Sequence, residues 1–215
     1  MNPRRLLPLL ALVVCLAPAA RAEDLVLLSD SHPAGLAIGD AAPMTDVKMK
    51  SVDGKDVTIA SVKGEKGTLV VFSCDHCPWA RAWETRIVEL GNAYPKRGVG
   101  MIVINSNDPT AYEEDAYPAM QQRAHERGMK YPYVVDATSG VARAFGAAHT
   151  PEAFLFDAKG RLVYHGTVDD NAHEPDKVEH RYLRDALDAV VAGREVAVKE
   201  TKALGCSIKF RGSAD

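Results

Sequence analysis

The sequence has no excess of positive charge, few cysteines and almost no long apolar runs. Its formal net charge is −3 over 215 residues, and nucleic-acid binding needs a basic patch, so that class is excluded. Internal repeats and low-complexity tracts are absent. After residue 22, no stretch is apolar enough to span a membrane. The length favours one ordinary domain with appendages.

The one long apolar run lies near the N-terminus. Arg4 and Arg5 precede an apolar stretch at residues 6–18 that is too short to span a bilayer, and a small–x–small pattern ends at Ala22. We expect residues 1–22 to be a secretory signal peptide that is cleaved after Ala22. The protein is then periplasmic or secreted, and the alternative is an uncleaved amphipathic anchor.

Three cysteines remain once the signal peptide is removed. Cys15 and three arginines lie within it, so the mature chain keeps Cys74, Cys77 and Cys206, and its net charge changes from −3 to −6. An odd number of cysteines in an exported protein leaves at least one thiol without a partner in the chain. This argues against a disulfide-stapled scaffold, and a chain of this length can rely on a hydrophobic core.

The hydrophobic patterns predict the order of the elements. Residues 23–36 form a lead-in with little pattern, 37–193 the folded domain and 194–215 a C-terminal tail that contains Cys206. The patterns predict a hairpin at 46–62 turning at Asp53-Gly54, strands at 67–73, 99–105 and 131–136, and a hairpin at 152–168 turning at Lys159-Gly160. They predict helices from Pro78 to about Tyr94, at 140–147 and at 183–191, and a charged helical insertion at 109–129, interrupted near Pro118.

Strands that alternate with helices predict an α/β domain. Its central mixed β-sheet is covered by helices on both faces, and the last hairpin adds an antiparallel edge. The pair Cys74 and Cys77 falls at the carboxyl end of a central strand, just before a helix that Pro78 is suited to open. In such sheets, ligands and chemistry are found at this position.

The segment Cys74-Asp75-His76-Cys77 has the chemistry of a redox-active pair. The helix N-terminus, the second thiol and a protonated His76 all favour the thiolate, whereas the charge of Asp75 opposes it. We predict that Cys74 is the exposed nucleophile and that Cys77 resolves the mixed disulfide. Asp75 and His76 are predicted to set the redox potential, because stabilising the thiolate makes the disulfide a stronger oxidant.

Other uses of closely spaced cysteines fit less well. Haem attachment needs a histidine directly after the second cysteine, where Pro78 stands. A structural disulfide across two residues closes a very small loop and adds little stability. Structural zinc needs four ligands, and no second ligand pair is present. Copper(I) prefers thiolates with an imidazole, which His149 or His165 could supply. We predict no metal and no cofactor, and a copper-binding or delivery module stays an alternative.

Three segments resemble the thioredoxin superfamily. They are "LAIGDAAP" at 36–43, "VFSCDHCPWA" at 71–80 and "HTPEAFLFDAKGRLVYHG" at 149–166. Their order is similar to the redoxin branch, where peroxiredoxin-like (AhpC/TSA) proteins and periplasmic thiol-disulfide reductases meet. The resemblance covers roughly residues 36 to 192. It implies a thioredoxin-like fold with an N-terminal hairpin extension and a helical insertion.

The resemblance also implies roles for single residues. Pro151, after Thr150, matches the family's cis-proline, which faces the cysteine pair and receives the substrate's backbone. Trp79 is expected to be mostly core, with the alternative that it borders the substrate groove. The implied partners are protein thiols or disulfides and an electron donor or acceptor of thioredoxin type.

A thiol peroxidase is the main alternative to a thiol-disulfide oxidoreductase. Cys77 is followed by proline, as a peroxidatic cysteine is in similar proteins. Peroxiredoxins have a threonine or serine three residues before that cysteine, and Cys74 stands there instead. Their upstream proline falls at Val70, and their arginine is replaced by Thr150-Pro151. The sequence therefore favours thiol-disulfide exchange.

Cys206 lies beyond the last predicted helix, in "GCSIKF" at 205–210. One interpretation is a small apolar residue in a C-terminal strand or docked tail. The other is a third redox thiol that resolves a mixed disulfide with Cys74 or Cys77.

Overall fold

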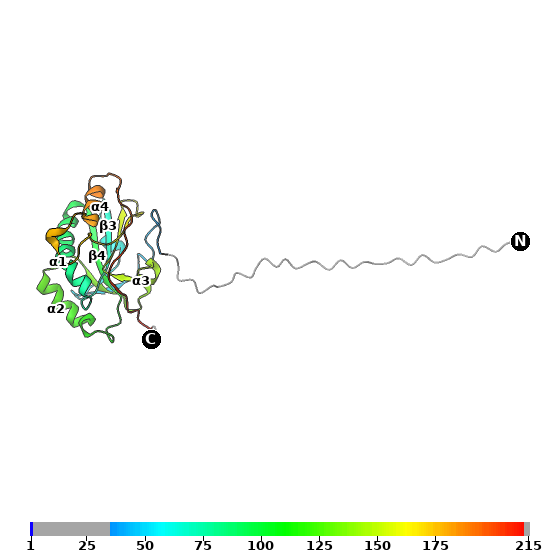
Figure 1. The fold of residues 1–215 in the computed structure, drawn as a ribbon. Coiled ribbons are helices and arrows are strands. Elements are labelled where there is room, and N and C mark those ends of the chain that lie inside the picture. The colour runs from blue at the N-terminus through cyan, green and yellow to red at the C-terminus, as the bar shows by residue number, and fades with distance from the viewer. Residues whose placement is uncertain (2–34, 213–215) are drawn as a thin grey trace. The chain divides into compact units, whose positions relative to one another are not determined.

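The computed structural model describes Met1 and residues 35–212 of the chain (Figure 1). The expected signal peptide and almost all of the lead-in lie outside the described residues. Residues 35–212 belong to one compact unit, His32–Asp215, and everything below concerns that unit.

The described elements follow the predicted order. The strands are β1 (Met49–Ser51), β2 (Asp56–Val57), β3 (Gly67–Phe72), β4 (Val99–Asn105), β5 (Tyr133–Val135), β6 (His149–Thr150), β7 (Glu152–Asp157), β8 (Leu162–Gly166) and β9 (Cys206–Ser207). The helices are α1 (Pro78–Ala93), α2 (Tyr117–Arg127), α3 (Gly140–Phe145) and α4 (Tyr182–Val191). Short 3-10 turns are η1 (Ala60–Val62), η2 (Tyr94–Arg97), η3 (Glu113–Asp115) and η4 (Pro175–Lys177).

Seven of the described strands form one mixed sheet. Their order is β2-β1-β5-β4-β3-β7-β8. The central strand β3 is parallel to β4 and antiparallel to β7, and β7 forms the last hairpin with β8. The N-terminal hairpin, β1 with β2, joins the sheet through β5. The predicted mixed sheet with a hairpin extension is therefore confirmed.

The two faces of β3 explain why its sequence is a continuous apolar run. Leu69 and Val71 pack with α1, α2 and α4 on one face, whereas Val70 and Phe72 pack with α3 on the other (Figure 1). All six residues of β3 are buried, and Thr68 is the one polar residue among them. The strand is thus fixed in the middle of the domain. Its carboxyl end therefore gives rigid support to the loop that follows it.

The helical insertion is tied to α1 by ion pairs. Glu84 of α1 accepts two hydrogen bonds from Arg123, at 2.7 and 2.8 Å, and Arg127 lies 2.6 Å from the same carboxylate. The Glu84 side chain is only 11% exposed. A bidentate arginine pair holds both partners in one geometry. The insertion is therefore docked on the helix that begins at Pro78.

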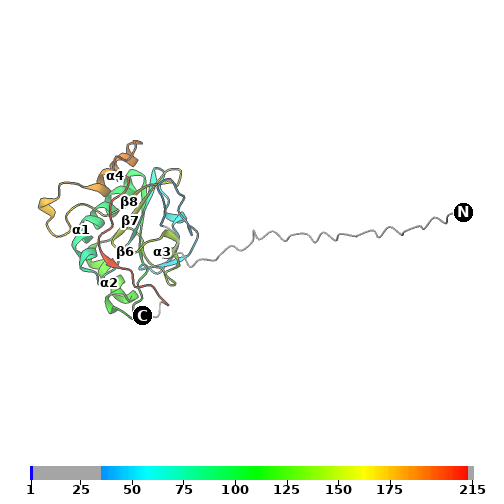
Figure 2. The ribbon, with the colours of Figure 1, turned by 45° about the vertical axis from the view of Figure 1, so that its right-hand side comes forward.

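A second, two-stranded sheet is formed by β6 and β9. His149 pairs with Ser207, and Thr150 pairs with Cys206, in antiparallel register. The C-terminal segment, drawn in red, thereby returns to the segment just before Pro151 (Figure 2). Of the two interpretations of Cys206, the docked C-terminal strand describes its position.

None of the described helices combines the length and the apolar character that crossing a bilayer requires.

Candidate active site

The loop between β3 and α1 carries the two cysteines. The backbone N–H of Ser73 still donates to Ile104 of β4, so the strand pairing continues to the residue before Cys74. Cys77 is the N-cap residue of α1, with extended backbone, and Pro78 opens the helix. Proline suits that position because its missing N–H would have no partner there. The loop therefore ends at the positive end of the helix dipole.

Both thiols of the loop are buried. Cys74 is 4% exposed and Cys77 is 0% exposed, and neither forms a disulfide in this structure. Cys74 is slightly more accessible than Cys77 but is itself buried, so the prediction that Cys74 is exposed is wrong. Its role as the nucleophile stays a prediction. Any partner must displace part of the surrounding chain to reach it.

Thr150 contacts both sulfur atoms. Its Oγ1 lies 3.2 Å from Cys74 Sγ, and its carbonyl oxygen accepts a hydrogen bond from Cys77 Sγ at 3.1 Å. The Thr150–Pro151 peptide bond is cis, as the resemblance implied. Residues 76 positions apart in the sequence thus form one side of the site.

The two thiols titrate together, and one of them loses its proton readily. The pKa of Cys77 is lowered to about 4, chiefly because the Cys74 thiol donates to its thiolate, and the same bond together with burial raises the pKa of Cys74. Thr150 acts in the opposite sense, because its carbonyl can only accept and so holds a proton on Cys77. Its hydroxyl can donate to Cys74. The pair therefore titrates as a unit, with Thr150 influencing which sulfur bears the charge.

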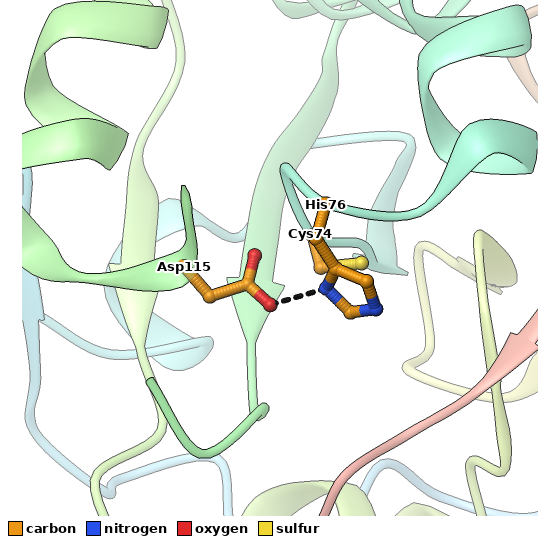
Figure 3. A group of neighbouring side chains, drawn as sticks. All are labelled: Cys74, His76 and Asp115. Carbon is orange, nitrogen blue, oxygen red and sulfur yellow. Dashed lines mark hydrogen bonds and ion pairs between the residues drawn. The ribbon is translucent and has the colours of Figure 1, made fainter. Parts of the chain in front are cut away.

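Asp115 holds the other side of the loop (Figure 3). Its Oδ1 accepts the backbone N–H of Asp75 at 2.8 Å and the side-chain amide of Asn105 at 3.2 Å. Its Oδ2 accepts Nδ1 of His76 at 2.5 Å. The residue is 1% exposed and lies in η3, within the helical insertion. A buried carboxylate with three donors is well satisfied and fixes the loop.

His76 is covered by an aromatic ring. Tyr112 stacks on the imidazole with parallel planes and a centroid separation of 3.8 Å. One nitrogen of the ring is bound to Asp115, so the orientation of His76 is fixed from two directions. The histidine of the motif is therefore part of a rigid wall.

Asp75 is buried, which changes its predicted role. It is 6% exposed, its Oδ1 accepts the hydroxyl of Tyr133 at 3.1 Å, and within the described residues its Oδ2 has no hydrogen-bond partner. Burial raises the pKa of Asp75 to about 7, against the smaller lowering effect of Tyr133. The sequence alone predicts a fixed negative charge beside Cys74. The structure instead places there a carboxyl group that titrates near neutral pH.

Cys74, His76 and Asp115 form a group that could hold a metal ion, with one donor atom of each within 4.8 Å of the others. Thiolate and imidazole suit copper or zinc. Each of the three, however, already has a partner in Thr150 or in the group itself. His149 and His165 do not belong to this group, because both face Glu152, at 3.9 and 2.6 Å. The distant ligands of the copper alternative are thus not brought to the cysteines.

The remaining predicted residues also lie at the pair. Trp79 and Cys206 pack against the cluster of Cys74, Cys77 and Ala80. The Trp79 ring also contacts His173, with a centroid separation of 5.2 Å. A pocket of about 750 Å³ lies away from the cysteines, beside the β7–β8 turn and the end of α4. None of the described cysteines lines it. The chemistry of this chain is concentrated at the covered loop.

Residues 38–165 match the sequence profile of the AhpC/TSA family, more than half of the chain. The chain belongs to the AhpC/TSA family. The thiol-disulfide oxidoreductase ResA of Geobacillus thermodenitrificans is 26% identical over 127 residues, 59% of this chain and 67% of that protein. An uncharacterised conserved protein from Geobacillus kaustophilus aligns with a TM-score of 0.76 and 37% identity, over 83% of this chain and 94% of that one.

The fold of this AhpC/TSA protein is also that of thioredoxin-like proteins. A thioredoxin-like protein in its oxidised form, solved in solution, aligns with a TM-score of 0.57 at 21% identity, over 72% of this chain and 98% of that one. At such identity the likeness concerns the fold alone. The predicted thioredoxin-like fold and the resemblance to the redoxin branch are confirmed.

Sequence reasoning missed the wall opposite Thr150. Asp115 was one acid among several in a charged insertion, and nothing in its spacing distinguished it from Glu113 or Glu114. Tyr133 and Asn105 were assigned to strands, without a role in the loop. The one usable signal was topological, because parallel neighbours β3 and β4 end at the same edge of the sheet.

Proposed function

We propose that this AhpC/TSA-family protein is a thiol-disulfide oxidoreductase that exchanges disulfides with partner proteins through Cys74 and Cys77. The observation that carries the proposal is the contact of both sulfurs with Thr150, beside the cis bond to Pro151 and the N-terminus of α1. The ResA relatives, named as thiol-disulfide oxidoreductases, support the same enzyme class. The reaction needs no further cofactor.

The reaction runs as two exchanges. Cys74 passes its proton to the Cys77 thiolate as its sulfur attacks one sulfur of a partner disulfide. A mixed disulfide forms, and the other partner sulfur leaves as a thiolate that takes up this proton from Cys77. The Cys77 thiolate then attacks Cys74 Sγ, the Cys74–Cys77 bond forms, and the second partner thiolate leaves. The partner gains two electrons and the pair loses two. Run backwards, the same steps oxidise a partner dithiol.

The residues around the two cysteines have two different roles. Asp75 and His76 tune the potential together with Asp115, because they lie at the loop that must accommodate the thiolate. Thr150, Pro151 and Trp79 border the sulfurs and form the surface that meets the partner's chain. The partners are proteins with thiols or disulfides, with a thioredoxin-type protein as electron donor or acceptor.

The protein acts outside the cytoplasm in this proposal. The N-terminal basic and apolar pattern of residues 1–22 supports export, followed by cleavage after Ala22. N-terminal sequencing of the protein recovered from its native compartment tests this step. A mature chain that still begins at Met1 in the cytoplasm would contradict it.

A redox titration with a disulfide-reductase assay tests the activity. The wild-type chain should reduce a protein disulfide at the expense of a thiol reductant, and one two-electron couple should be detected. Cys74→Ser and Cys77→Ser should each lose turnover, whereas Ser207→Ala, an exposed change nearby, should not. Full turnover in either cysteine variant would refute the proposal.

A thiol peroxidase is the second candidate, and one observation favours it. Cys77 precedes a proline, and its pKa is lowered to about 4, as a peroxide-reducing thiolate requires. A peroxide-consumption assay separates the two functions. Peroxide turnover that survives Cys74→Ser and is lost in Cys77→Ser would make the peroxidase the better description.

A further inference from the structure

The C-terminal strand occupies the backbone edge nearest to the reactive sulfurs. Thr150 of β6 contacts both Cys74 and Cys77, and its strand partner is Cys206 of β9. An extended peptide that added a strand at β6 would use the same backbone groups. The chain's own residues 206–207 therefore stand where a bound peptide would stand, with a thiol facing the pair.

Gly205 permits this close approach. A Cβ at that position would lie 2.1 Å from the carbonyl oxygen of Thr150, far inside any real contact. The carbonyl oxygen of Thr150 belongs to the backbone and cannot move aside easily. The residue before Cys206 thus has to be glycine for β9 to lie where it does.

The strand is held on both of its sides. Before it, the backbone N–H of Thr201 donates to His165 at 3.0 Å, and its hydroxyl accepts from the N–H of Thr167 at 3.0 Å. After it, Ile208 donates to Ala148 at 2.9 Å and Lys209 donates to the side chain of Asn107 at 2.6 Å. These bonds place Cys206 in a defined position beside the loop.

Cys206 is the most accessible of the three described cysteines. It is half-buried, whereas Cys74 and Cys77 are at most 4% exposed, and it packs against that pair. Cys206 also lowers the pKa of Cys77. In return its own pKa is raised to about 11, first by burial and then by Cys77. The second of these causes disappears when Cys77 is in a disulfide.

We propose that Cys206 is the third member of the exchange, the thiol through which the oxidised Cys74–Cys77 pair takes electrons from an external protein dithiol. The proposal rests on the proposed function, since it assigns how the Cys74–Cys77 disulfide left by that reaction is reduced again. In this proposal β9 occupies the position that a strand of a bound substrate would take.

The steps conserve atoms and electrons. In the oxidised protein the Cys206 thiolate attacks Cys77 Sγ, the Cys74–Cys77 bond breaks, the Cys77–Cys206 bond forms, and Cys74 leaves as a thiolate that takes up the proton lost by Cys206. An external protein thiolate then attacks Cys206 Sγ and Cys77 leaves. The second thiol of that partner attacks its own mixed disulfide and releases Cys206. The partner ends as a disulfide, and the protein has gained two electrons.

Disulfide mapping tests the first step. Full-length Cys74→Ser, treated with the thiol oxidant diamide and then alkylated, should contain a Cys77–Cys206 link within a monomer, seen by mass spectrometry of its peptides. Cys77→Ser should give no monomeric Cys74–Cys206 link. Free thiols or only intermolecular disulfides in Cys74→Ser would overturn the proposal, and so would an efficient Cys74–Cys206 link in Cys77→Ser.

Reduction kinetics test the use of Cys206. The oxidised protein is mixed with a reduced thioredoxin, and the fluorescence of Trp79, which packs against the pair, reports the reaction. Cys206→Ser and Gly205→Ala should slow reduction by about tenfold or more, because exchange between sulfurs already in contact is effectively intramolecular. Ser207→Ala should leave the rate unchanged.

The outcomes separate the two proposals. Unchanged or faster reduction in Cys206→Ser or Gly205→Ala means that β9 only covers the pair, and the role of Cys206 is refuted while the proposed function stands. If Cys74→Ser and Cys77→Ser still turn over a protein disulfide, the proposed function itself has failed.

Discussion

The two sides of the Cys74–Cys77 loop are held by different kinds of contact. On one side, the buried side chain of Asp115 receives hydrogen bonds from Asp75, His76 and Asn105. On the other side, Thr150 meets the sulfurs with one hydroxyl and one backbone carbonyl, and only a two-residue strand lies behind it. The first side is a fixed wall, whereas the second can be rebuilt by another chain in extended conformation.

The two sides also act on the same thiol in opposite directions. The negative charge of Asp115 raises the pKa of Cys74, and the hydroxyl of Thr150 lowers it. A partner strand that replaces β9 would leave the Asp115 side unchanged. Partner binding and tuning of the thiol pKa are thus assigned to separate parts of one small site.

Removing the Cys77 sulfur, which donates to the Thr150 carbonyl, should have the largest effect on turnover. In Cys77→Ser the mixed disulfide formed by Cys74 cannot be resolved, so turnover should fall by on the order of a thousandfold or more. A covalent adduct with the partner should accumulate. The measurement is the disulfide-reductase rate together with non-reducing electrophoresis, and an adduct-free variant with normal turnover would contradict the division of roles.

Changing the loop residue on the Asp115 side should alter the pH dependence of stability. Asp75 has a pKa of about 7 in the folded protein and a reference value of 3.8, so the folded state binds its proton more tightly. Its contribution is complete below pH 3.8 and is lost as the pH rises through 7, a few kcal/mol in all. Asp75→Asn should remove this slope and be more stable than wild type at pH 8.

Denaturant unfolding at several pH values measures that difference directly. Asp176→Asn, an exposed change in η4, is the matched control and should follow the wild-type curve. Parallel curves for wild type and Asp75→Asn would show that the pKa of Asp75 is the same in the folded and unfolded states.

Neutralising the fixed wall should cost stability and ease ionisation of the pair. Asp115→Asn keeps the shape but replaces one accepting oxygen by a donor that faces the donors of its former partners, so we expect a loss of about 1–3 kcal/mol of unfolding free energy. The apparent pKa of Cys74 should fall, because a charge that opposes its thiolate is removed. Alkylation rates followed against pH would detect it, and an unchanged profile would contradict the assignment.

The smallest effect, of opposite sign, is expected from the Thr150 side. Thr150→Val keeps the volume and the backbone of β6 but removes the hydroxyl that can donate to Cys74. The apparent pKa of Cys74 should rise, and stability should fall by about 0.5–1 kcal/mol. The same alkylation profile is the measurement. Shifts of equal sign in Asp115→Asn and Thr150→Val would show that the two residues do not act on Cys74 in opposite directions.

Most of the fold could be predicted from the sequence because its signals are local. Continuous apolar runs identified β3 and β4, a glycine turn identified the β7–β8 hairpin, and Pro78 identified the start of α1. The cysteine loop followed from that order. These features depend on residues that are neighbours in the chain.

The Asp115 side of the site and the pairing of β6 with β9 could not be predicted because they depend on tertiary contacts, whereas the resemblance implied Thr150 and Pro151 at the cysteine pair. Asp115 reaches the loop only because η3 follows β4 at the edge shared with β3. The β6–β9 pair joins segments of two residues each, too short for any pattern. The burial of Asp75 could not be predicted either, because the sequence around an acid between two cysteines does not indicate whether its side chain faces the core or solvent.

The bidentate pair between Glu84 and Arg123 makes the helical insertion and α1 a single mechanical piece. Shortening the chain between β4 and β5 would remove Asp115 and, with Arg123 and Arg127, the partners of a carboxylate that is 11% exposed. An engineer who trims this protein to a smaller scaffold therefore has to redesign the middle of α1 as well.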